Sequence, residues 1–88
     1  MYNVNCKELK RMETTLFKYG LCGGGSVLPV SLEDGTQVKK DFHYLYDNHN
    51  ICVRFYYSRL DSGMWYNLKR IQFENFKTGK IITFNAID

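Results

Sequence analysis

The sequence lacks the features that mark several specialised classes of protein. Its 88 residues contain no apolar run long enough to span a membrane, and the N-terminal stretch has no apolar core of a signal peptide. The three cysteines, Cys6, Cys22 and Cys52, are odd in number and widely spaced, whereas small secreted domains held by disulfides carry an even, denser set. These absences predict a soluble, cytoplasmic protein that has no membrane partner.

A strong charge of one sign is also missing. Twelve Lys and Arg oppose nine Asp and Glu, and the resulting net charge of +3 is well below that of an obligate nucleic-acid binder. What the chain does contain is a core-forming composition, with 44% hydrophobic and 16% aromatic residues, unlike a disordered chain. This length provides for one domain. We therefore predict a single compact domain over residues 1–88.

The first regular element is predicted to be an amphipathic helix over about residues 5–19. Asn5 is a suitable N-cap, and Glu8 three residues later completes a pair that resembles a capping box. Gly20 follows the last turn, where a helix end favours a positive φ. The apolar stripe recurs at helical spacing and consists of Leu9, Met12, Leu16, Phe17 and Tyr19.

The next segment, GLCGGGS at residues 20–26, raises the question of a phosphate-binding loop. Gly20 and Gly25 have the separation of a P-loop, but Ser26 and Val27 stand where the motif needs Lys and Ser or Thr. The segment also follows a helix instead of opening one, so its amides would not lie at a helix N-terminus. We therefore predict a hinge-like, glycine-rich connector and no cofactor.

After residue 26 the apolar period changes from 3.6 to 2, which predicts about five antiparallel strands within residues 27–85. Pro29 has no N–H and places the first strand at a sheet edge. A shift in the apolar alternation predicts a β-bulge near Lys69 and Arg70, and Gly79 suits the last hairpin turn. The predicted fold class is α+β, with one helix packed on a curled antiparallel meander whose other face is partly exposed.

Candidate catalytic and metal-ligating residues are sparse. His49 and Cys52 have a His-x-x-Cys spacing, but a zinc site needs further paired ligands. Cys22 could act as a nucleophile with His43 or His49, yet nothing in the sequence orients such a pair. A chain of this size also has little room for a pocket of about 300 Å³. We predict a protein that is not an enzyme and binds no metal.

Basic and aromatic residues interleave in RFYYSR and MWYNLKR. Strand alternation places Arg54 and Tyr56 on the face opposite the apolar residues of their strand. Aromatic rings framed by cations stack nucleic-acid bases, and the same residue types anchor protein–protein interfaces. We predict a partner-binding site on this surface, formed by Arg54, Tyr56, Trp65, Lys69 and Arg70.

Two functions remain open. The first is a small non-catalytic module that binds and occludes a partner protein, because the chain combines one compact domain with modest charge and no catalytic motif. In size and composition the chain is similar to phage-borne inhibitors of host enzymes, including anti-CRISPR inhibitors of defence nucleases. The second is a β module that binds single-stranded nucleic acid through the basic and aromatic face. The weak charge and the missing RNA-recognition motif place this nucleic-acid-binding function second. The sequence leaves open whether the protein is a monomer or a homodimer.

Overall fold

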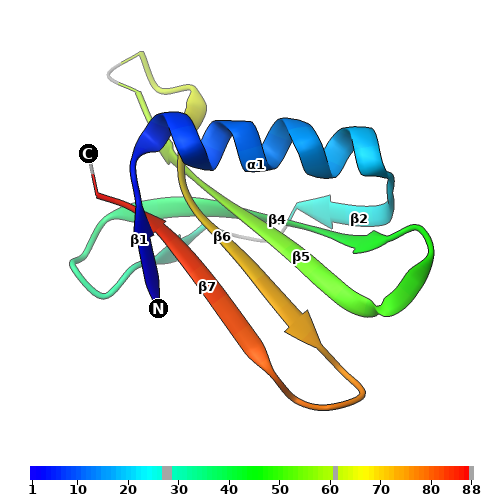
Figure 1. The fold of residues 1–88 in the computed structure, drawn as a ribbon. Helices are drawn as coiled ribbons and strands as arrows, with labels where there is room; N and C mark the ends of the chain where they lie inside the picture. Colours follow the sequence, from blue (N-terminus) through cyan, green and yellow to red (C-terminus); the bar gives the residue numbers. More distant parts are fainter. Residues whose placement is uncertain (27–28, 61, 88) are drawn as a thin grey trace.

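The computed structural model describes residues 1–26, 29–60 and 62–87. Within these residues one helix, α1, packs on a mostly antiparallel, open sheet of seven strands (Figure 1). The predicted α+β class is confirmed, although the sheet contains more strands than the five expected. In chain order the elements are β1 (Tyr2–Val4), α1 (Cys6–Tyr19), β2 (Leu21–Ser26), β3 (Val30–Ser31), β4 (Gln37–Leu45), β5 (Asn48–Arg59), β6 (Trp65–Asn75) and β7 (Ile81–Ala86).

The strand order is β1-β7-β6-β5-β4-β2, so β4 to β7 form the predicted meander. Strands β2 and β3 both pair with β4, where Ser26 lies opposite Asp41 and Val30 lies opposite Val38. They are consecutive pieces of one edge, and exposed Pro29 lies beside the second piece, as expected for an edge. At the other edge β1 runs parallel to β7. Its three residues are too few to show a periodicity in the sequence.

The ends of α1 follow the predicted capping chemistry. The Asn5 side chain accepts a hydrogen bond of 2.8 Å from the backbone N–H of Glu8. At the other end Gly20 has a φ of 124°, and its N–H donates to the Leu16 carbonyl at 3.1 Å. Among the described residues, no helix is both long enough and apolar enough to cross a membrane.

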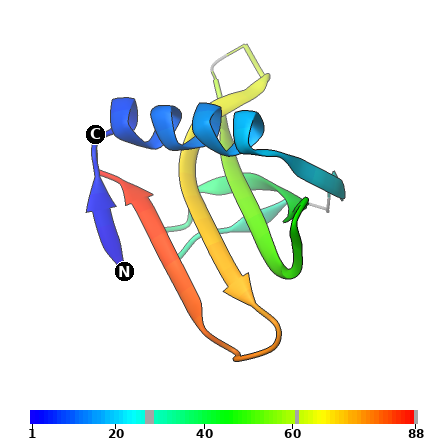
Figure 2. The same cartoon turned by 45° about the vertical axis from the view of Figure 1, so that its right-hand side comes forward.

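The main core lies between α1 and the sheet (Figure 2). Alternate residues of β5 face the helix, as predicted. Burial of each large side chain contributes about 1.5–3 kcal/mol, and a hydrogen bond from the Tyr57 hydroxyl to the Glu13 carboxylate also links sheet to helix. The fully buried members of this cluster are Leu9, Val53, Phe55, Leu68 and Ile71.

The predicted bulge in β6 is confirmed. Arg70 pairs with Tyr56 but Leu68 pairs with Tyr57, so Lys69 is the extra residue. The bulge allows Leu68 and Ile71, three positions apart, both to face the helix. The last hairpin also follows its sequence, since Gly79 has a φ of +77°.

The predicted connector over residues 20–26 is corrected by the structure, which places strand β2 there. A Cβ added at Gly24 would lie 2.1 Å from the Phe42 carbonyl oxygen and 2.8 Å from His43 Nδ1, and φ at Gly24 is +109°. Glycine is therefore needed for the close approach of β2 to β4 rather than for freedom of movement. Val27 and Leu28, expected in the next strand, lie outside the described residues.

Candidate functional site

The structure brings three of the five predicted partner-binding residues together. Arg54, Tyr56 and Arg70 lie on the sheet face opposite α1, where the Arg70 guanidinium is 5.5 Å from the centre of the Tyr56 ring. Lys69 is the bulge residue beside Arg70. Trp65 lies near the turn between β5 and β6, with the Arg59 guanidinium 4.7 Å from its ring. The predicted site is therefore divided between two places.

Arg54 and Tyr56 belong to a network of polar side chains on this face. The Arg54 guanidinium forms an ion pair of 2.8 Å with Glu74 and donates to the Gln72 amide oxygen at 3.3 Å. The Tyr56 hydroxyl donates to the same oxygen at 3.3 Å, and the Gln72 amide N–H donates to Thr83 at 3.2 Å. These polar side chains can be partly or fully buried because they satisfy one another's hydrogen-bonding groups. Burial also raises the pKa of the Tyr56 phenol.

Arg70 is held more tightly still. Its Nε donates to the Asn85 amide oxygen at 2.6 Å, and its two terminal nitrogens contact both carboxylate oxygens of Glu33 at 3.3 and 2.8 Å. This fork geometry matches a carboxylate, and the hydrogen bonds from Arg70 lower the pKa of Glu33. Arg70 and Tyr56 are each only 7% exposed. Both are thus committed to contacts within the chain.

A hollow of about 260 Å³ opens beside Arg54 on the same face. Three aromatic rings contact in series, with ring centres 6.0 Å apart for Phe42 and Tyr44 and 6.3 Å apart for Tyr44 and Phe76. The sequence contains a sign of this grouping, because Lys40, Phe42 and Tyr44 are alternate residues of β4 and therefore lie on the same face of the sheet. We call this the aromatic hollow, lined by Lys40, Phe42, Tyr44, Cys52, Arg54 and Phe76.

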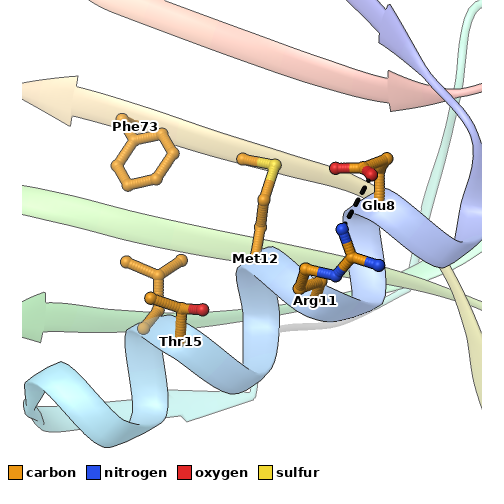
Figure 3. A pocket seen from close by; sticks show the side chains of 6 residues that line it. Glu8, Arg11, Met12, Thr15 and Phe73 are labelled. Carbon is orange, nitrogen blue, oxygen red and sulfur yellow. Dashed lines mark hydrogen bonds and ion pairs between the residues drawn. The ribbon is translucent and has the colours of Figure 1, made fainter.

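A second surface lies on the helix side, because the hairpin of β6 and β7 extends past α1 (Figures 1 and 2). A hollow of about 310 Å³ is lined by residues of α1 and by Phe73 of β6, with Met12 reaching from the helix toward the strand that carries Phe73 (Figure 3). A second hollow of about 230 Å³ shares Phe73. We call the two together the helix-side groove, lined by Glu8, Arg11, Met12, Thr15, Leu16, Phe73, Leu45, Ile51, Asn75, Lys80 and Ile82.

The groove has an apolar floor and a polar rim. Met12, Leu16 and Phe73 pack against the buried core and are themselves only partly buried. At one end the rim carries the ion pair of Arg11 with Glu8, at 3.0 Å. An apolar centre surrounded by polar residues is the usual composition of a protein interface.

The structure also brings together a cysteine and a histidine that the sequence could not orient. The Cys22 sulfur lies 3.3 Å from Nε2 of His49, beside an open hollow of about 400 Å³. His43 instead packs edge-on against the Phe17 and Phe55 rings on the helix side. The hollows of 310 and 400 Å³ correct the expectation that the chain has little room for one of about 300 Å³.

The structure does not pair His49 with Cys52, despite their His-x-x-Cys spacing in the sequence. Cys52 is 2% exposed, and burial raises the pKa of its thiol, whereas His49 is exposed and contacts Cys22. Within the described parts of the chain, no group of three or more His, Cys, Asp or Glu residues could hold a metal ion. Three surfaces therefore remain as candidates: the helix-side groove, the aromatic hollow and the Cys22–His49 pair.

No protein-family model, curated protein or solved structure matches this chain. The functional argument therefore depends on the chemistry of the three surfaces.

Proposed function

We propose that the chain is a small, non-catalytic protein-binding module whose helix-side groove holds an apolar segment of a partner protein. The observation that carries the proposal is the shared position of Phe73, which joins two hollows into one apolar floor beside α1. With only 14 residues, α1 leaves the ends of β6 and β7 uncovered. A contiguous apolar surface rimmed by polar residues marks an interaction site.

The groove can supply useful binding energy. Met12, Phe73 and Ile82 are partly buried in the chain alone and would lose their remaining contact with water under a partner segment. Each such side chain contributes on the order of 1 kcal/mol when its burial is completed. A few anchors of this kind dominate a typical interface.

In its more specific form, the proposal is that binding occludes a host enzyme such as a defence nuclease, in the cytoplasm, as phage-borne inhibitors do. The size of 88 residues, the 16% aromatic content and the net charge of +3 support this form. To occlude a partner, the chain needs a surface that holds the partner rather than a catalytic group. The helix-side groove supplies such a surface.

A matched pair of threonine variants tests the groove. Thr15 is exposed and lines the groove, so Thr15→Arg places a charged side chain at its mouth without removing a core contact. Neighbouring Thr14 is also exposed, and its hydroxyl donates to the Lys10 carbonyl of its own helix. We expect Thr15→Arg to weaken partner binding by about tenfold or more, and Thr14→Arg to leave it unchanged.

The measurement has two stages. Proteins captured from a host lysate by the wild type and by each variant are first compared by quantitative mass spectrometry, with nuclease treatment throughout. The identified partner is then titrated by calorimetry, and inhibition of its activity is measured. Equal affinity of the Thr15→Arg and Thr14→Arg variants would remove the groove from the interface.

A second candidate function rests on the aromatic hollow, where three rings and two cations meet. Rings of this kind stack the bases of single-stranded nucleic acid while cations neutralise its phosphates. Glu74 already neutralises Arg54, which limits the positive charge and places this candidate second. It predicts binding of a single-stranded oligonucleotide that weakens steeply with salt and with Phe76→Ser, but not with Thr15→Arg. No binding at low salt would dismiss it.

A further inference from the structure

The contact between Cys22 and His49 is made by residues from two strands that do not pair with each other. Cys22 lies in β2 opposite Tyr44 of β4. On the other side of β4, Tyr44 pairs with Cys52 while Leu45 pairs with Asn48. Residues 49–51 are thus an extra length of β5 between two consecutive positions of β4. This irregularity at the corner brings His49 Nε2 to 3.3 Å from the Cys22 sulfur.

The surroundings of the pair are open to a small molecule. The hollow of about 400 Å³ is lined by Cys22, Gly23, Tyr44 and His49. Gly23 presents no side chain, and His49 is exposed. The Tyr44 ring forms an aromatic wall, so the hollow provides both access to the sulfur and an apolar surface for a bound group.

We propose that Cys22 is a reactive thiol, with His49 as its base, and that it reacts with small-molecule disulfides. A thiolate is the attacking form of cysteine, and an adjacent base that takes up the thiol proton produces it. The proposal concerns a stoichiometric modification and is independent of the partner-binding proposal.

The reaction balances without a further reagent. His49 Nε2 takes the proton from the Cys22 sulfur, which then attacks one sulfur of the disulfide. A new bond joins Cys22 to that sulfur while the original S–S bond breaks. The departing sulfur leaves as a thiolate and receives the proton from His49. Cys22 is oxidised to a mixed disulfide, and the departing half of the small-molecule disulfide is reduced to a thiol.

The other two cysteines provide internal standards. Cys52 is 2% exposed and its pKa is raised by burial, so its modification reports loss of the folded structure. Cys6 is partly buried and lies at the start of α1. A change at Cys22 with no change at Cys6 or Cys52 therefore isolates the effect of His49.

The experiment follows glutathionylation of each cysteine by peptide mass spectrometry after addition of glutathione disulfide. We expect Cys22 to react at least about tenfold faster than Cys52, and His49→Gln to slow Cys22 by about tenfold. Glutamine keeps the size and hydrogen bonding of the side chain but cannot take up a proton. His43→Gln, which changes the histidine on the other face of the sheet, is expected to leave the Cys22 rate unchanged.

Chemical rescue separates a base from a structural role. In the His49→Ala variant, added imidazole is expected to restore the Cys22 rate without changing the Cys6 rate, because the exposed position admits the small base. Equal Cys22 rates in the wild type and His49→Gln would overturn the proposal. A His49→Ala variant that stays slow in imidazole, while Cys52 remains protected, would overturn it as well. In the Thr15→Arg variant, Cys22 should react at the wild-type rate. Partner binding by Thr15→Arg and the Cys22 rate in the His49 variants therefore test the two proposals separately.

Discussion

The two faces of the sheet bury residues by different means. On the face toward α1, Val53 and Phe55 are completely buried among apolar side chains. On the opposite face, the intervening Arg54 and Tyr56 lie in a network of hydrogen bonds and ion pairs. Arg70, whose guanidinium lies over the Tyr56 ring, links this network to Glu33 in the turn between β3 and β4. The helix α1 covers part of one face, whereas side chains of the sheet and one turn cover part of the other.

This difference shows how the two faces can be perturbed. Apolar contacts are non-directional, so their loss scales with the volume removed. A buried polar network depends on each partner, because a group left without its hydrogen bond bears the cost of desolvation. The helix side should therefore respond to changes in size, and the opposite face to changes in charge state.

The largest expected effect is on the helix side. Phe55→Ala removes a fully buried ring that contacts Phe17, His43 and Tyr57. We expect it to lower the free energy of unfolding by about 3–5 kcal/mol, measured by urea denaturation. Phe17→Ala is the control, because Phe17 stacks on Phe55 but is 51% exposed. Equal losses in the two variants would show that α1 does not seal this face.

A smaller effect is expected at the edge between the two faces, where β2 meets β4. Gly24→Ala would place a methyl group 2.1 Å from the Phe42 carbonyl oxygen at a φ of +109°. We expect a loss of about 1–3 kcal/mol in the free energy of unfolding. At Gly25 the nearest atom to an added Cβ is 3.7 Å away, so Gly25→Ala should change stability by less than about 1 kcal/mol. If both alanines are tolerated, β2 is a mobile connector after all.

The sequence predicted what local chemistry determines. The caps of α1 depend on Asn5 and Gly20, and the bulge at Lys69 shows as a change in apolar parity. Strand β2 was missed because its glycines have no side-chain alternation, and its role depends on the carbonyl of Phe42, distant in the sequence.

The candidate surfaces were less predictable for a similar reason. Strand parity grouped Arg54 with Tyr56, but their burial depends on Gln72 and Glu74 in the next strand. The helix-side groove depends on how far α1 extends over the sheet, which helical periodicity does not specify. The contact of Cys22 with His49 spans 27 residues and arises from the irregular corner of β5.

The smallest expected effect tests the polar face through pH. Arg70 lowers the pKa of Glu33 from its ordinary value of 4.5, chiefly through hydrogen bonds to the carboxylate. A carboxyl group whose pKa is lower in the folded state adds stability above its unfolded pKa, and this is lost as pH falls through the folded value. The wild type should therefore lose stability on acidification below about pH 5, and Glu33→Gln should lose less.

Urea midpoints measured from neutral pH to about pH 3 test this difference. Asp34 retains a slope in the variant, because hydrogen bonds from Thr36 also lower the pKa of its carboxyl group. Phe55→Ala should keep the full wild-type slope at reduced stability, since it changes the apolar face and leaves Glu33 with Arg70. Parallel curves for the wild type and Glu33→Gln would mean that the pair adds nothing in solution, as is common when one partner is exposed to water. Arg70 would then be held by its contacts with Asn85 and Tyr56.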